Sequence, residues 1–378
     1  MSSPVKTSPF SAFGINFYKN NKKLQETEGN VVASPISALT VLAMALNGAR
    51  GETEAELRQA LQVSAVREEV ERIFFEAINS LKKTENAVVT MANKAFIADR
   101  FNIKPNYVAS LKKSFLTTIE GIDFSASDAT TKINDWVAEA TNQKIQKLFV
   151  DPLDSATRLV LVNALYFKGE WRKQFDRDET ETKPFKSTSG NLNVQMMSLS
   201  SAFYYKKLDQ YDAQLVEIPY KGNEFSMVII LPNKEDGLTE LEGKLGQQNL
   251  TELLFDAEWS RVNISLPRFK IESSHDLKPL MQKMGVNLIF LNGSDFSGIT
   301  DENVSVTSIV QKAYIDVNEE GSEAAAATGI SMELTSAPGL SGFNFNCDHP
   351  FLYFVLFKRA FTIFGGRVSK PTITTDIV

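Results

Sequence analysis

The sequence contains a single cysteine, Cys347, and only two histidines, His275 and His349. One cysteine excludes a disulfide bond within the chain. A zinc site built from His and Cys would be short of ligands, so we expect no metal site. No apolar run approaches the roughly 18 residues that are needed to span a bilayer. We therefore expect no membrane partner either.

The short motifs of common catalytic and nucleotide-binding sites are also missing. The chain has no G-x-S-x-G, G-x-G-x-x-G, P-loop or H-E-x-x-H sequence. Cys347 and His349 lie two residues apart, which would place both on one face of a strand. Pro350 and the neighbouring polar residues instead favour a turn that leads into a strand. Because a catalytic triad is recognised by several roles and only one is filled here, the sequence predicts that the protein is not an enzyme.

The composition is that of an ordinary globular protein. Of the 378 residues, 43% are hydrophobic and 23% are charged, and 26 phenylalanines can supply a large core. No linker, change in composition or repeat divides the chain, so we expect one domain over residues 1–378. The net charge of −6 and the pI of about 5.3 disfavour nucleic acid as a partner. We expect a monomer.

The sequence gives only weak signals for the cellular compartment. Residues 1–6 lack the apolar core of a signal peptide, which indicates either an intracellular protein or a leader replaced by the initiator methionine. Glycosylation sequons occur at about the frequency expected by chance. They begin at Asn249, Asn263, Asn292 and Asn303. We expect an extracellular protein, with the cytoplasm as the alternative.

Helical patterns fill the first part of the chain. Ser34 before Pro35 is a typical start for a helix, which the apolar spacing extends to Gly48. Thr53 and Glu56 form a capping box that predicts the start of the next helix. Apolar residues at helical spacing predict further helices over residues 66–83, 131–146 and 276–284.

Strand patterns dominate the remainder. Residues 158–167 are almost continuously apolar, as expected of a strand that is buried on both faces. Further strands are predicted over residues 87–98, 215–218, 225–231, 262–266, 304–317, 352–357 and 362–368. Together the patterns predict a mixed α+β domain with large, mostly antiparallel sheets.

The segment from Glu319 to Asn346 has neither a convincing helix cap nor a hairpin signal. From Ser322 to Met332 small and apolar residues alternate with small or polar ones, as in a strand with one face on a core. The run that follows, which contains Pro338, is typical of a loop. Four alanines favour a helix, but nearby glycines leave it short and marginal. A loop of about 28 residues is rare in a compact domain and usually functional, so we expect a mobile segment that can join a sheet.

Several blocks of sequence resemble the serpin family, and they follow one another in the family's order along essentially the whole chain. Residues 163–171 resemble the pattern N-A-x-Y-F-K-G-x-W, and residues 345–355 resemble the family's C-terminal signature. Other similar blocks are residues 30–37, 48–53, 194–197, 231–232, 266–270 and 295–299. The sequence D-H-P-F at residues 348–351 resembles arthropod members.

The resemblance implies a serpin fold: a single domain with three β-sheets, about nine helices and an exposed reactive-centre loop at about residues 319–346. Its hinge would be Glu319, Glu320, Gly321, Ser322, Glu323, Ala324, Ala325, Ala326, Ala327 and Thr328. Family members are suicide inhibitors of proteases or non-inhibitory relatives such as carriers and chaperones. A hinge that enters a sheet needs small side chains and no proline, so the alanines favour an inhibitor.

The mechanism implied by the resemblance begins when a serine protease attacks the loop and forms an acyl-enzyme. The freed hinge then enters a sheet as a central strand. About 14 residues at roughly 3.3 Å each would carry the protease about 45 Å. Distortion of its active site by about 1 Å can slow the reaction around 100-fold, so deacylation stalls. By family analogy, we expect the protein to restrain an extracellular proteolytic cascade such as one of innate immunity.

The scissile bond is placed by counting along the family's loop. Fourteen residues after Gly321 is Thr335, followed by Ser336. The loop is a few residues longer than in common members, so counting back from the C-terminal signature ends nearer Gly339. Further candidates for the scissile position are Leu334, Ala337 and Met332.

The loop also lacks a basic residue. No Lys or Arg occurs between Lys312 and Lys358. A simple trypsin-like target is therefore not indicated, and an elastase-like or chymotrypsin-like serine protease is the expected partner.

The resemblance also implies a region that controls opening of the sheet, with Ser34, Asn163, Trp171 and Gln311. Many members carry histidine where this chain has Gln311. We expect the amide of Gln311 to complete the polar cluster with Ser34 and Asn163, although an ordinary buried, hydrogen-bonded glutamine has the same pattern.

No cofactor is required by this mechanism. Basic residues cluster locally, which leaves a heparin-like glycosaminoglycan site as a further expectation on grounds of local charge. The clusters are Lys82–Lys83, Lys112–Lys113, Lys168 with Arg172–Lys173, and Lys206–Lys207. Glutamates in the helix predicted over residues 66–83 argue against a site there.

Overall fold

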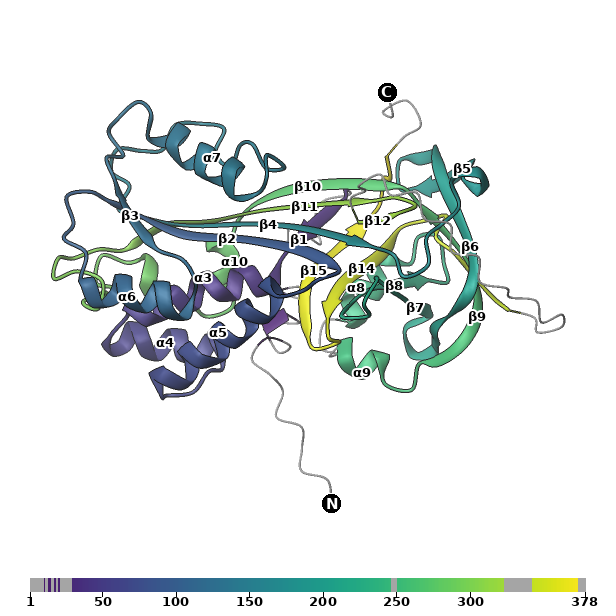
Figure 1. Ribbon diagram of the computed structural model, residues 1–378, viewed down its shortest axis with the longest axis horizontal. Helices are drawn as coiled ribbons and strands as arrows, with labels where there is room; N and C mark the ends of the chain where they lie inside the picture. The colour runs from purple at the N-terminus through teal and green to yellow at the C-terminus, as the bar shows by residue number, and fades with distance from the viewer. Residues whose placement is uncertain are drawn as a thin grey trace, which may run out of the picture.

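The protein is a mixed α+β domain in this computed structural model, which describes Phe10, Phe13, Gly14, Phe17, Asn20 and residues 29–245, 250–322 and 342–372 (Figure 1). The α-helices of this part are α3 (Pro35–Gly48), α4 (Gly51–Leu61), α5 (Arg67–Lys82), α6 (Pro105–Ser114), α7 (Ala129–Ala140), α8 (Leu238–Leu245), α9 (Leu250–Leu254) and α10 (Lys278–Lys283). None of them combines the length and the apolar character that a membrane crossing requires.

A six-stranded sheet extends across the molecule (Figure 1). Its strands, in spatial order, are β10 (Phe269–Asp276), β11 (Val306–Val317), β12 (Gly321–Ser322), β4 (Leu159–Glu170), β2 (Ala87–Ala98) and β3 (Ile119–Ile122). The central strands β11 and β4 are parallel and pair directly with each other from Val306 to Tyr314 of β11. At one end the two-residue strand β12 lies between them.

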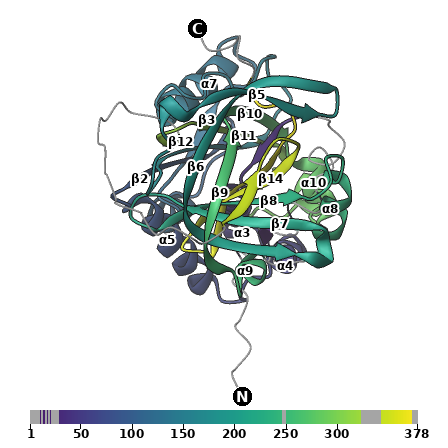
Figure 2. The same cartoon turned by 90° about the vertical axis from the view of Figure 1, so that its right-hand side faces the viewer.

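The second sheet has nine strands (Figure 2). The path runs through β1 (Val31–Ala33), β15 (Phe361–Val368), β14 (Phe351–Phe357), β8 (Phe225–Pro232), β7 (Ala213–Pro219), β6 (Gly190–Leu208), β9 (Glu258–Pro267) and β13 (Phe343–Asn346), and β5 (Glu181–Ser187) also pairs with β6. The 19-residue strand β6 pairs with β7 near its end and with β9 and β5 before it. It thus joins two smaller sheets, which agrees with the expectation of three.

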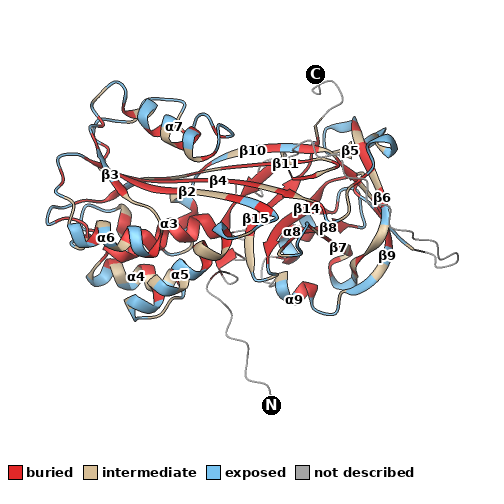
Figure 3. Ribbon diagram, in the orientation of Figure 1, coloured by how far each residue is buried: buried red, intermediate tan, exposed pale blue. Residues whose placement is uncertain are grey.

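Helices cover both faces of the six-stranded sheet. Figure 1 shows α7 on one face and α3 with its neighbours on the other. The ring of Trp136 on α7 meets Phe96 on β2 edge-to-face at 5.7 Å, and every residue of α3 is buried. Strand β4 is buried along nearly its whole length (Figure 3). The sheet therefore forms the centre of the main core.

Most predicted elements are confirmed, with instructive differences at their ends. Strand β2 has the predicted bounds, and Ser34 caps α3 by accepting a hydrogen bond from the Ser37 amide at 3.3 Å. The capping box at Thr53 is wrong. Helix α4 begins two residues earlier, and the Thr53 hydroxyl instead accepts a hydrogen bond from the Asp295 amide at 2.9 Å.

The helix predicted over residues 131–146 also differs at its end. Helix α7 stops at Ala140, and both Asn142 and Gln143 have left-handed φ angles, 51° and 63°. Successive left-handed residues cannot continue a right-handed helix. The apolar spacing beyond Ala140 therefore belongs to a turn.

Candidate functional site: the hinge end of the six-stranded sheet

The start of the predicted hinge is already part of the six-stranded sheet. Ser322 pairs with Val317 of β11 on one side and with Gly169 of β4 on the other, and both pairings are antiparallel. Further along, β11 and β4 close directly on each other, with Tyr314 opposite Tyr166. The two central strands are therefore separated only at the end where the hinge enters.

Ser322 lies in a buried aromatic corner. Its side chain is fully buried, and its hydroxyl oxygen lies 2.6 Å from that of Tyr220. The ring of Tyr220 stacks on Trp171, with centroids 4.4 Å apart and planes 15° apart. Burial raises the pKa of Tyr220 well above its ordinary value, so its hydroxyl stays protonated and able to donate. The Trp171 indole donates to the Asn318 carbonyl at 2.9 Å, which fixes the turn before the hinge.

Gly321 is required by close approach of the backbone. A Cβ atom there would collide with the carbonyl oxygen of Gly169 and lie 2.7 Å from the Cα atom of Glu170. A Cβ atom at Gly169 would in turn lie 2.8 Å from the ring of Phe167. Only glycine tolerates contacts this short, so Gly321 allows β12 to lie against β4, and Gly169 leaves space for the ring of Phe167.

Two carboxylates anchor the residues before β12. Glu319 is only 2% exposed and accepts hydrogen bonds from Arg268 Nε at 2.8 and 2.9 Å and from the Thr180 hydroxyl at 2.6 Å. Arg268 Nη2 completes the ion pair at 2.6 Å. Glu320 pairs with Arg177, and its backbone carbonyl accepts from the Trp171 amide at 2.8 Å. Since a buried charge without a partner is costly, Arg268 and Glu319 depend on each other.

A second polar cluster lies under the closed part of the sheet. The side chain of Gln311 accepts from the Ser34 amide and donates to the Ser34 carbonyl and to Asn163 Oδ1, all at 2.8 Å. Asn163 donates to Asn93 Oδ1 at 2.6 Å and also to Ser37. Gln311, Asn163 and Asn93 stand opposite one another on β11, β4 and β2. These buried amides connect the two central strands to each other and to the start of α3.

The predicted site residues therefore fall into two groups. Ser34, Asn163 and Gln311 come together beneath the sheet, whereas Trp171 lies with Ser322 just past the far end of β4. Other predicted residues lie outside the described part of the chain: the hinge residues Glu323, Ala324, Ala325, Ala326, Ala327 and Thr328, and the scissile-bond candidates Met332, Leu334, Thr335, Ser336 and Ala337.

Several residues of these clusters were not predicted, among them Ser37, Asn93, Tyr220 and Arg268. Ser37 and Arg268 fall inside sequence blocks that resemble the family, which could have marked them. Asn93 could have been found from its amide within a mostly apolar strand. Tyr220 carries no local signal, because its role depends on the strand that lies against it.

The segment around Cys347 forms no nucleophilic pair. His349 Nδ1 lies 2.7 Å from Asp348 Oδ1, and its Nε2 lies 2.8 Å from the carbonyl of Pro232. Cys347 is buried, and burial together with the nearby charge of Asp348 raises the pKa of its thiol well above the ordinary value. The interpretation as a structural turn is confirmed. Among the described residues, no group of three His, Cys, Asp or Glu side chains could hold a metal ion.

Comparison with known proteins agrees with this geometry. The family model described as "Serpin (serine protease inhibitor)" matches residues 9–371. Human Serpin B3 is 36% identical over 91% of this chain and 94% of its own length, and leukocyte elastase inhibitor from pig is 36% identical over 91% and 93%. The structure of Serpin48 from the insect Tenebrio molitor has a TM-score of 0.87 and 36% identity, and the match covers 96% of this chain and 97% of that one.

The relatives correct the expected compartment. A protein from Tachypleus tridentatus that is named intracellular coagulation inhibitor 2 is 36% identical over 95% of this chain and 89% of its own length. The name of this relative describes an intracellular protein. The expectation of an extracellular protein is therefore wrong. The glycosylation sequons gave only weak support for secretion, because chance explains their number.

Three observations therefore agree with one another. The domain is mixed α+β, Gly321 and Ser322 separate the two central strands at one end of the six-stranded sheet, and the sequence blocks follow the order of the family that they resemble. The relatives include protease inhibitors, and the family model matches nearly the whole chain. We conclude from these relatives that the protein is not an enzyme. The chain belongs to the serpin family.

Proposed function

We propose that this serpin inhibits a serine protease as a suicide substrate. The protease cleaves the loop after Thr335 or a neighbouring residue and remains attached as an acyl-enzyme, while the hinge enters the six-stranded sheet between β11 and β4. The observation that carries the proposal is the position of β12. Ser322 already pairs with both strands and Gly321 pairs with β4, so further hinge residues would enter between β11 and β4 directly after Ser322.

The surroundings of Ser322 explain why the hinge needs small side chains. The hydroxyl of Tyr220 and the fully buried position leave no space for a larger group at this point of the sheet. Ala324 and Ala326, which the alternation in the sequence predicts to face the same way in an inserted strand, are also small. When β11 and β4 separate, small side chains on this face can follow Ser322 and pack against the core.

The partner that we propose is an elastase-like or chymotrypsin-like protease. The absence of Lys and Arg between Lys312 and Lys358 argues against a trypsin-like specificity. One relative of 36% identity is named leukocyte elastase inhibitor, which supports the same class. A role in innate immunity and acceleration by a heparin-like glycosaminoglycan stay predictions, and the inhibition rate with and without heparin tests the second.

The decisive experiment mixes the protein with elastase, chymotrypsin and trypsin and separates the products on a denaturing gel. We expect a band of the combined mass with elastase or chymotrypsin, because the acyl bond survives denaturation. Sequencing the peptide released from the complex identifies the scissile bond. The matched control is protein whose loop has been cleaved beforehand, which should form no complex. Cleavage by every protease without any complex would favour the alternative of a non-inhibitory carrier or chaperone.

A further inference from the structure

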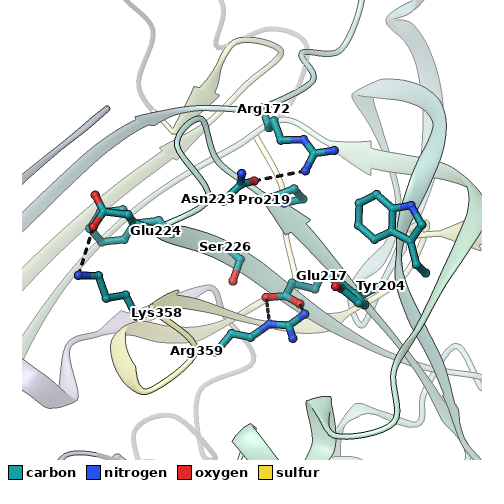
Figure 4. Close-up of a pocket in the computed structure, with 11 residues that line it drawn as sticks. Arg172, Tyr204, Glu217, Pro219, Asn223, Glu224, Ser226, Lys358 and Arg359 are labelled. Carbon is teal, nitrogen blue, oxygen red and sulfur yellow. Dashed lines mark hydrogen bonds and ion pairs between the residues drawn. The ribbon is translucent and has the colours of Figure 1, made fainter. Parts of the chain in front are cut away.

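A pocket of about 440 Å³ opens on one face of the nine-stranded sheet, at the junction of β9, β6, β7 and β8 (Figure 4). Its floor follows the register of the strands. Trp259 of β9, Tyr204 of β6 and Glu217 of β7 stand opposite one another, so their side chains share this face. Ser226 of β8 stands opposite Pro219 of β7, two residues beyond Glu217, and thus belongs to the same face.

The pocket lies where helices α8 and α9 no longer cover this face of the sheet. Farther along the same face, Leu215 of β7 and Val228 of β8 belong to an apolar cluster with Leu253 and Leu254 of α9. None of the residues of α8 or α9 lines the pocket. The strands therefore extend beyond the helices and leave Glu217 and Ser226 at the base of a hollow.

The charges in the pocket leave one cation without a carboxylate. Glu217 is 4% exposed and is bound by Arg359 through Nε at 3.0 Å and through Nη2. Glu224 pairs with Lys358 at 3.3 Å. Arg172 reaches only the Asn223 side-chain oxygen, at 3.3 Å, and pairs with no carboxylate in the described part of the chain. Once the two pairs are set aside, the lining carries a single net positive charge.

Aromatic side chains form one wall. The rings of Tyr204 and Trp259 meet edge-to-face with centroids 4.9 Å apart. The guanidinium of Arg172 lies 5.5 Å from the centre of the Trp259 ring. Trp259 is 47% exposed, which leaves ring surface open to a ligand.

A hydroxyl group lies between the cation and the buried ion pair. Figure 4 shows Ser226 between Arg172 on one side and the Arg359–Glu217 pair on the other. Ser226 is only 7% exposed and lines the pocket. A hydroxyl that lines a pocket can donate a hydrogen bond to a ligand oxygen placed there.

We propose that this pocket binds a small aromatic carboxylate. The ring packs against Trp259 and Pro219, the carboxylate pairs with Arg172, and Ser226 donates a hydrogen bond to it. A cationic ligand does not fit, because both carboxylates already have cations. A polyphosphate does not fit either, because it needs more than one free cation. The volume lies within the range of about 300–1,000 Å³ that is usual for sites of small organic ligands.

The test compares two ligands that differ only in charge. Binding of 5-fluoroindole-3-acetate and of 5-fluoroindole-3-acetamide to the full-length protein is followed by fluorine NMR and by the shift in melting temperature. We expect the acetate to bind with a dissociation constant below about 1 mM. We expect the neutral amide to bind at least about tenfold more weakly, because charge-assisted hydrogen bonds are the stronger ones.

Variants locate the site. Arg172→Gln should weaken acetate binding about tenfold or more while leaving amide binding unchanged. Trp259→Ala should weaken both ligands, since both use the ring. Lys221→Gln is the matched control. Lys221 is an exposed cation near the pocket, is not part of its lining and pairs with Glu170 at 3.2 Å, so this variant should bind as the unchanged protein does.

Two results would overturn the proposal: no binding of the acetate at about 1 mM, or equal binding of the acetate by Arg172→Gln and by the unchanged protein. Arg172 and Trp259 are both on the surface, so their variants should fold. The melting temperatures without ligand verify this. The measurement does not involve a protease, and its result is independent of the proposed inhibition.

Discussion

The hydroxyl oxygens of Ser322 and Tyr220 lie 2.6 Å apart, although the two residues are separated by 102 positions in the sequence. Both side chains are fully buried. This hydrogen bond connects the start of the hinge to the second sheet, and it is formed before any protease is present. The hinge of this chain is thus held in place at its first position by a specific partner.

Removal of either hydroxyl should loosen β12. We expect Tyr220→Phe and Ser322→Ala each to lower the protection of the Ser322 amide from hydrogen exchange by about 1 kcal/mol, the usual net value of a hydrogen bond. The double variant should lose little more than either single variant, since both remove the same bond. Fully additive losses would show that the two hydroxyl groups do not interact.

Ser322→Arg should convert the inhibitor into a substrate. The arginine would have to enter a packed site against Tyr220 without a carboxylate partner, which is costly. We expect cleavage at a nearly normal rate and no trapped complex on a denaturing gel. Glu323→Arg, at the next position and predicted to face outward, should have a much smaller effect. A comparable loss of trapping from both changes would refute the assignment of faces.

Cleavage of the loop should make the protein more stable. If the segment after Ser322 is a strand that the intact sheet lacks, cutting within residues 332–339 lets it join β11 and β4. We expect the melting temperature to rise by tens of degrees, and calorimetry before and after limited proteolysis measures the change. An unchanged or lower melting temperature would mark the segment as an ordinary surface loop.

Gln311→Leu should destabilise the closed sheet. The amide and carbonyl of Ser34 and the side-chain oxygen of Asn163 would lose their partner in a dry interior. Unsatisfied groups of this kind cost about 1–3 kcal/mol each, so we expect a loss of about 2–4 kcal/mol in denaturant unfolding. Gln311→His, which restores a side chain able to form hydrogen bonds, should lose less. Equal stability of Gln311→Leu and the unchanged protein would contradict a stabilising role of the cluster.

Cys347 should be unreactive in the folded protein. Burial and the neighbouring charge of Asp348 raise the pKa of its thiol, so at pH 8 the reactive thiolate is scarce. A chromogenic disulfide reagent should modify Cys347 only after denaturant unfolds the chain. Rapid modification of the native protein would contradict the burial of this residue.

The sequence predicted those elements whose pattern is local. Strand β2 was found with its observed bounds because most of its residues are apolar, and α3 was found because Ser34 and Pro35 mark its start. Strand β6 was missed as an element. It belongs to two smaller sheets, so no single alternation of polar and apolar residues runs along its 19 residues.

The candidate site was predictable only in part, because some of its contacts leave no local pattern in the sequence. Resemblance to a family identified Ser34, Asn163 and Gln311, and the structure shows the hydrogen bonds that join them. The pair of Arg268 and Glu319 depends on the position of the segment before β12, which no local pattern contains. A strand of two residues such as β12 is too short to have any periodicity.

The parallel pairing of β11 and β4 has a consequence for how the protein could be used. A strand that enters between them runs antiparallel to both, as Gly321 and Ser322 already do. Under the proposed mechanism, one parallel ladder is exchanged for two antiparallel ladders, and the antiparallel arrangement is somewhat more stable per residue. Withdrawal of the inserted strand from the sheet would require both new ladders to break together. Each molecule would then act once, and the amount of protease that a cell could neutralise would depend on how many copies it holds and how fast it replaces them.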